Sequence, residues 1–118
     1  MTDRELLEYA AKAGGITGIK WHESGEGGWL DGCGAPSTWW NPLTDDGDAL
    51  RLAVKLHLSI RYTWDGGNDE FDAVYVDGRG SICVEEQIGF FHMEQIDEKI
   101  ATRRAIVRAA AKIGKAML

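Results

Sequence analysis

Three carboxylates that lie close together, Asp45, Asp46 and Asp48, are the side chains of this sequence with the clearest chemical potential. Their hard oxygen atoms are of the type that binds divalent cations. Their spacing does not match a calcium-binding loop, however, and acidic side chains at the start of a helix are favoured by the helix dipole. We therefore interpret the cluster as helix capping and predict no metal site.

Two cysteines and three histidines are the other candidates for chemistry: Cys33, Cys83, His22, His57 and His92. They could supply four zinc ligands, but none belongs to the CxxC or HxxxH pairs typical of structural zinc sites. A nucleophile formed by Cys33 and His22 would need its base within hydrogen-bond reach, and nothing in the spacing indicates this. Because two cysteines cannot form a disulfide framework, we expect reduced thiols. The sequence predicts no catalytic residue and no cofactor.

Tryptophan is the residue type with the most promise for binding, because it is enriched at the hot spots of protein interfaces. Trp21 and Trp29 lie among glycines, and we expect them to be partly exposed. Trp39 and Trp40 are expected to cap a small core, and all four are candidate partner-binding residues. The segment 16–42 that carries them is more acidic than basic, whereas base-stacking sites lie in basic grooves.

The net charge of −6 is unevenly distributed along the chain. Residues 1–91 contain 7 Lys or Arg and 16 Asp or Glu, whereas residues 92–118 contain 6 and 3. An acidic chain is a poor ligand for phosphate backbones, so we expect no nucleic-acid partner. Arg104, Arg108 and Lys112 recur at helical spacing in the basic part. We interpret this stripe as a solvated face paired with nearby acids, and its alternative is a docking site for an acidic partner.

Hydrophobic periodicity predicts three helices separated by a long loop and a small sheet. The opening helix has Thr2 and Glu5 at the spacing of a capping box. In the second helix, Leu50, Val54 and His57 recur with Ala53 on one face, which we expect to be buried. The predicted helices cover 2–13, 45–57 and 93–117, and the strands cover 58–64, 71–77 and 81–86. The Gly/Trp-rich loop covers 16–42, and short strands are possible within it at 16–21 and 29–30.

The turns between the three strands, at 65–69 and 77–80, are too short for a parallel crossover, so the strands are expected to form an antiparallel meander. With the last helix packed across this sheet, residues 1–118 form a single α+β domain. If helices lie on both faces of the sheet, the domain is a three-layer α-β-α sandwich. No apolar run approaches the length of about 18 residues that a membrane span needs, and the charged start lacks a signal core. We therefore expect a cytoplasmic protein with no membrane partner.

Three segments of the chain resemble the phage ABA sandwich domain family. They are the block Trp-Asn-Pro-Leu-Thr-Asp-Asp-Gly-Asp-Ala-Leu-Arg-Leu-Ala at 40–53, the alanine- and arginine-rich segment at 101–111, and the opening segment at 2–8. The resemblance covers nearly the whole chain. It implies a bacteriophage or prophage protein with a sandwich fold, located in the cytoplasm of the bacterial host. The family supplies no established activity, so no functional residue is carried over.

Two functional hypotheses follow from the sequence. The first is a phage-encoded accessory protein without catalytic activity that binds a host or phage protein. Because the last helix is apolar on more than one face, this hypothesis includes a homodimer that uses that helix or the Trp-rich loop. The alternative is a small enzyme or metal-dependent ligand binder in which the loop closes over His22, Asp45 and Asp48.

Overall fold

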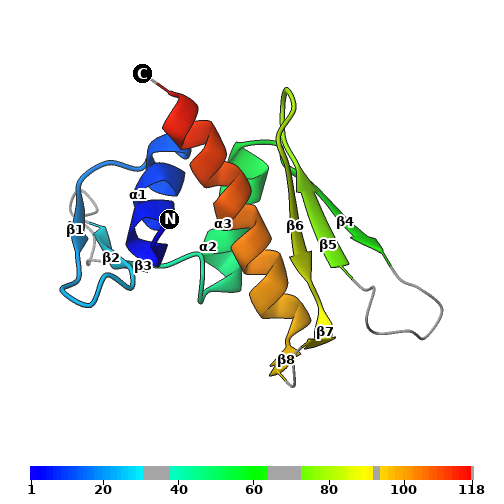
Figure 1. The fold of residues 1–118 in the computed structure, drawn as a ribbon. Helices are drawn as coiled ribbons and strands as arrows, with labels where there is room; N and C mark the ends of the chain where they lie inside the picture. Colours follow the sequence, from blue (N-terminus) through cyan, green and yellow to red (C-terminus); the bar gives the residue numbers. More distant parts are fainter. Residues whose placement is uncertain (31–37, 64–72, 92–93, 118) are drawn as a thin grey trace.

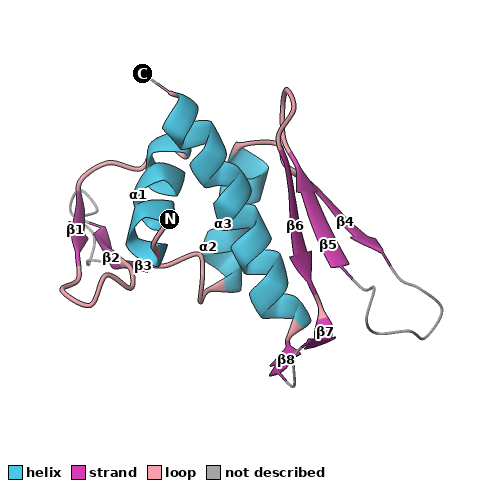
Figure 2. Ribbon diagram, in the orientation of Figure 1, coloured by secondary structure: helices cyan, strands magenta, loops and turns pink. Residues whose placement is uncertain are grey.

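A computed structural model of the protein describes residues 1–30, 38–63, 73–91 and 94–117. Within these residues, three helices lie between two small antiparallel sheets (Figures 1 and 2). A two-stranded hairpin, β7–β8, precedes the last helix. The elements are α1 (Asp3–Ala13), β1 (Ile19–Trp21), β2 (Gly28–Leu30), β3 (Thr38–Trp40), α2 (Asp46–Lys55), β4 (Ser59–Thr63), β5 (Ala73–Asp77), β6 (Cys83–Gln87), β7 (Gly89–Phe91), β8 (Glu94–Ile96) and α3 (Glu98–Ala116).

Each helix begins at a side-chain cap that the sequence makes available. The Thr2 hydroxyl accepts a hydrogen bond from the Glu5 amide, and the Glu5 carboxylate accepts one from the Thr2 amide, which confirms the predicted capping box. Asp45 caps α2 by accepting from the Asp48 amide, and Asp97 caps α3 in the same way. Such caps satisfy backbone N–H groups that have no partner within the helix.

Helices α1 and α2 end in the same hydrogen-bonding pattern but with different residues at its strained position. In α1 the left-handed residue is Gly15, with φ +69, and in α2 it is His57, with φ +52. The amide of the next residue returns to the helix at 2.9 Å in both cases, from Ile16 to Ala11 and from Leu58 to Ala53. Glycine adopts this conformation without the steric cost that a histidine side chain brings.

Replacing His57 by Gly is therefore expected to stabilise the protein. Relief of the left-handed conformation outweighs the added freedom of the unfolded chain, so we expect a gain of about 0.5–1 kcal/mol in the free energy of unfolding. Thermal or urea denaturation measures this change. Gly15→Ala is the matched control at the equivalent position of α1, and we expect it to lose about 1 kcal/mol. An unchanged or lower stability for His57→Gly would contradict the expectation.

The sheet β4-β5-β6 is the predicted antiparallel meander, and α3 packs across one of its faces. That face presents Val74, Val76 and Val84, all of which are buried. The opposite face carries Arg61 and Asp77, which form an ion pair at 3.2 Å, together with other polar residues. The α+β class is confirmed, whereas the finer three-layer α-β-α order is not.

Helix α3 is the centre of the domain, and it contacts α1, α2, β5 and β6. Ala105, Val107, Ala109, Ala110 and Ala111 are fully buried along it. The breadth of its apolar surface, from which the sequence analysis predicts a homodimer through this helix, is thus explained by contacts within one chain. No helix of the described residues is long and apolar enough to cross a membrane.

Three sequence expectations are corrected by the fold. The last helix, expected over 93–117, begins only at Glu98, because residues 94–96 form β8 and Asp97 caps the helix. The segment 16–42, expected to be a loop in which short strands are possible at 16–21 and 29–30, carries the three short strands of the sheet β1-β2-β3, of which β3 is not indicated by the sequence. In α2 the buried face is formed by Ala49, Leu52 and Ala53 with Asp48, whereas the expected face is largely exposed, with His57 beyond the helix end. The expectations for Cys33, His92 and the turn at 65–69 lie outside the described residues.

Candidate functional site

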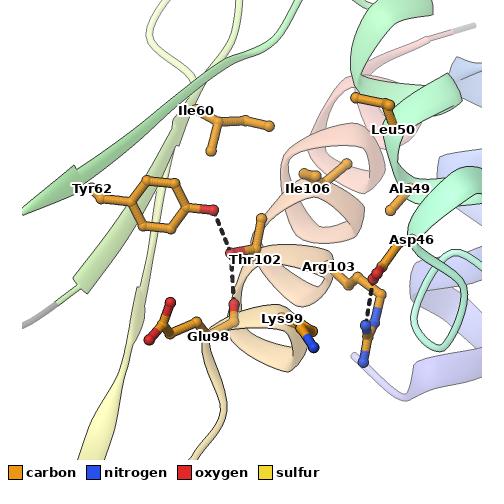
Figure 3. A pocket seen from close by; sticks show the side chains of 10 residues that line it. All are labelled: Asp46, Ala49, Leu50, Ile60, Tyr62, Glu98, Lys99, Thr102, Arg103 and Ile106. Carbon is orange, nitrogen blue, oxygen red and sulfur yellow. Dashed lines mark hydrogen bonds and ion pairs between the residues drawn. The ribbon is translucent and has the colours of Figure 1, made fainter.

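The strongest candidate site is a groove between α2, β4 and α3, which we call the α2–β4–α3 groove. Its cavity has a volume of about 260 Å³, with apolar side chains of all three elements at its centre and polar side chains at its rim. Figure 3 shows Ile60 and Tyr62 of β4 pointing toward α3, with Leu50 of α2 facing them from the other side. Ile106 of α3 forms part of the floor and is buried.

The apolar side chains of this groove and its border are unusually exposed. Leu50 is 58% exposed and Val54, one helical turn further along α2, is 64% exposed. Tyr62 is 56% exposed, and Ile60 lies at 36%. Exposed apolar residues that occur singly need no explanation, but a group that lines a groove marks an interaction site or a ligand site.

The polar rim of the groove is internally paired. The Thr102 hydroxyl donates to the Glu98 carbonyl at 2.6 Å. The Tyr62 hydroxyl lies 2.8 Å from the Thr102 hydroxyl oxygen, and because the Thr102 proton is already used, Tyr62 is the donor of this second bond. Arg103 bonds to the Asp46 carboxylate, and its Nε donates to the Leu43 carbonyl at 2.9 Å. These contacts fix the rim and leave the apolar centre as the part of the groove without polar partners in the described residues.

The three carboxylates at the start of α2 are engaged in holding the fold. Asp45 caps the helix, and Asp46 pairs with Arg103. The buried Asp48 accepts from the Asn41 amide at 3.0 Å and from Arg51 at 2.7 Å. The capping interpretation is therefore confirmed for Asp45, whereas Asp46 and Asp48 bind other parts of the chain. In the part of the chain that the structure describes, no group of three His, Cys, Asp or Glu side chains is arranged to hold a metal ion.

The four tryptophans predicted to bind a partner divide into two pairs. Trp40 is buried and meets Trp21 edge to face, with ring centroids 6.2 Å apart, and the Arg4 guanidinium lies over the Trp21 ring. Trp29 is 46% exposed and meets Trp39 edge to face at 5.1 Å on the other face of the small sheet. Trp21 and Trp40 therefore join this sheet to the core, and Trp29 with Trp39 forms an aromatic surface.

The predicted basic stripe lies on α3 beside β6 and α1. Glu86 accepts from Arg108 at 2.8 Å and lies 3.5 Å from Arg104, which also contacts Asp3 at 3.3 Å. Lys112 lines a surface hollow together with Glu86, Arg104 and Arg108. Ion pairs at this degree of exposure are worth about 0–1 kcal/mol each. The arrangement supports the interpretation of a solvated face over that of a docking site.

Cys83 lies on the polar face of the sheet opposite Asp77. Its hydrogen bond to the Asp77 carboxylate raises the pKa of the Cys83 thiol, and the same bond, together with Arg61, lowers the pKa of Asp77. A nucleophilic cysteine needs a lowered pKa. The thiol is thus held in its protonated, less reactive form.

The groove residues Leu50, Ile60 and Tyr62, and Val54 one turn beyond Leu50 on α2, are absent from the site predicted by sequence. Their signal is present, however, because the segment 45–57 is apolar on two adjacent faces. One of these faces covers the core, and the other borders the groove. A helix whose apolar surface is wider than its contacts within the chain is the feature that could have identified them.

No family model matches the chain, and neither does any curated protein or solved structure. The fold and the groove define the protein as a small α+β domain with an exposed apolar surface.

Proposed function

We propose that this protein acts without catalysis, by binding another polypeptide in the α2–β4–α3 groove. The observation that carries the proposal is that three exposed apolar side chains, Leu50 of α2 and Ile60 and Tyr62 of β4, line one groove against α3, while Val54 continues the exposed apolar row along α2. Their burial against a partner would remove apolar surface from water, which is a general driving force for association.

The biological setting is part of the same proposal. The similarity of residues 40–53 and 101–111 to the phage ABA sandwich domain family supports a phage or prophage accessory protein that acts in the cytoplasm of a bacterial host. The finer three-layer α-β-α order rests on the same resemblance.

The double variant Leu50→Lys/Val54→Lys tests the proposed function. Both side chains are exposed, so we expect a change in stability within about 0.5 kcal/mol per substitution. Two added charges in an apolar interface should abolish association, measured as the particle mass in solution and as the proteins recovered from a bacterial lysate. The matched control is Ile100→Lys, because Ile100 is 53% exposed on α3 but does not line the groove.

We expect the control to behave as the unmodified chain in both measurements. If the double variant keeps every partner and its particle mass, the groove is not the binding site. If it unfolds, Leu50 and Val54 belong to the core, which would also contradict the proposal.

A further inference from the structure

We propose that the polypeptide in the α2–β4–α3 groove is a second copy of this chain, joined by antiparallel pairing of β4 with β4 of the copy. The inference rests on the proposed function and names its partner. It predicts one continuous sheet of six strands across the two chains, with the two-fold axis at Arg61.

The first support is that β4 is an unprotected edge. It is the outer strand in the order β4-β5-β6, and no described element lies beyond it (Figure 1). Its five residues pair with β5 in regular register and include no proline, no lysine and no bulge, which are features that protect edges, and its one charged side chain, Arg61, is paired with Asp77 of β5. The other edge strand, β6, carries Glu85 and an inward-pointing Glu86. Of the two edges of this sheet, β4 is therefore the one that the described residues leave open to another strand.

The second support is that the sequence of β4 complements itself. Ser59-Ile60-Arg61-Tyr62-Thr63 reads as polar, apolar, basic, apolar and polar from either end. In an antiparallel pair centred on Arg61, Ile60 faces Tyr62 of the copy, and Ser59 faces Thr63 of the copy. A two-fold interface needs this kind of self-complementary surface, and pairs of aromatic and β-branched side chains stabilise antiparallel strands.

The third support is that the pairing would cover the exposed apolar groups. Ile60 and Tyr62 point to the face of the sheet on which Leu50 of α2 and Ile106 of α3 lie (Figure 3). The same two side chains of the copy would extend this cluster beside Leu50. The rim adds no net charge, since Asp46 pairs with Arg103, and Glu98 and Lys99 have opposite signs. An apolar and neutral surface fits an identical one without a cost in unpaired charge.

The pairing has one electrostatic cost, which the fold reduces. It places Arg61 opposite Arg61 of the copy, and like charges directly opposite destabilise a strand pair. Each Arg61 is held by Asp77 at 3.2 Å and lies over the Tyr75 ring at 4.7 Å. Each guanidinium therefore lies over β5 of its own chain, where the Asp77 carboxylate partly neutralises its charge and weakens the repulsion between the two copies.

Single-cysteine variants test both the partner and the register. In a Cys33→Ser/Cys83→Ser background, Arg61→Cys places the new thiol on the two-fold axis. Directly opposite residues of antiparallel strands have Cα atoms about 4.5–5.5 Å apart, within the range of a disulfide. We expect mild oxidation to convert Arg61→Cys into a covalent dimer. Ser59→Cys is the matched control, because its two copies would lie four residues apart along the strands, about 13 Å, and should not join.

A mixture of Ser59→Cys and Thr63→Cys chains should form the mixed disulfide, because these positions face each other in the proposed register. The particle mass of the unmodified chain gives a second, independent measurement. We expect twice the 13.0 kDa of one chain, a single-chain mass for Ile60→Lys, and an unchanged dimer for Ile100→Lys.

The inference is overturned if the unmodified chain stays at 13.0 kDa at high concentration, or if Ser59→Cys joins as readily as Arg61→Cys. A single-chain mass for the unmodified protein would reject the second copy as the partner. If that protein nevertheless recovers another protein from the lysate, and Leu50→Lys/Val54→Lys does not, the proposed function still stands. A single-chain mass with no partner lost on substitution would reject both.

Discussion

Replacing Gly114 by Ala is expected to lower the free energy of unfolding by about 3 kcal/mol, because α3 contacts the backbone of α1 at this position. A Cβ atom on Gly114 would overlap the carbonyl oxygen of Tyr9 and come within 2.7 Å of its carbonyl carbon. Neither atom can move without shifting α1, since both belong to the helix backbone. The overlap therefore outweighs the gain of about 1 kcal/mol that Ala has over Gly in a helix. Thermal denaturation should show a fall of about 10 °C.

Gly47→Ala is the matched control for this substitution, since Gly47 also lies in a helix. A Cβ atom there would meet the ends of Arg51 and of the capping Asp45 at 3.2 Å, and a small side-chain rotation relieves such contacts, unlike a contact with helix backbone. We expect Gly47→Ala to be neutral or to stabilise the protein by up to about 1 kcal/mol. If Gly114→Ala melts at or above the temperature of the unmodified chain, the close approach of α1 and α3 is not as described.

The parts of the fold that the sequence predicts are those encoded by neighbouring residues. The capping box of Thr2 and Glu5 identifies the start of α1, and Asp45 identifies the start of α2. The turn at 77–80 joins strands of opposite direction, and it fixes the meander with little help from the rest of the chain. Each of these signals acts over four residues or fewer, so no tertiary contact is needed to interpret it.

The buried face of α2 could not be predicted from its sequence, because two overlapping faces are apolar. The series that begins at Leu50 and the one that begins at Ala49 both have helical spacing and share Ala53. Only the neighbouring elements decide between them, and they bury Leu52 and leave Val54 exposed. The groove was missed for the same reason, since its residues are identified by what the core leaves uncovered.

The small sheet β1-β2-β3 is only weakly indicated by the sequence, because glycines surround its strands. Each strand has three residues, which is too short for a clear alternation. The sheet depends on close approach, since a Cβ atom on Gly28 would come within 2.8 Å of the Lys20 carbonyl oxygen and one on Gly27 within 2.7 Å of that of Trp40. Such contacts between segments cannot be recognised from composition, which here suggests a loop.

The block Trp-Asn-Pro-Leu-Thr-Asp-Asp-Gly-Asp owes its residue types to a buried polar junction. Asn41 donates from its side chain to the Glu26 carbonyl at 3.1 Å and accepts from the Leu43 amide at 3.0 Å. The backbone N–H of Asn41 donates to the carboxylate of Asp48, which is 6% exposed. These bonds join the β1–β2 turn, the end of β3 and the first turn of α2. A buried polar group without its partner costs about 1–3 kcal/mol, so the junction should be sensitive to any change.

Asp48→Ala is accordingly expected to lower the free energy of unfolding by about 3 kcal/mol. The buried Asn41 amide loses its acceptor, and the first turn of α2 loses a negative charge worth about 0.3–1 kcal/mol. Asp48→Asn keeps one side-chain oxygen for that amide, so we expect it to lose only about 1 kcal/mol. Urea denaturation of both variants measures the difference. Equal losses for Ala and Asn would show that the charge, not the acceptor, stabilises the junction. A calcium-dependent rise in melting temperature that Asp48→Asn removes would instead assign these carboxylates to a cation.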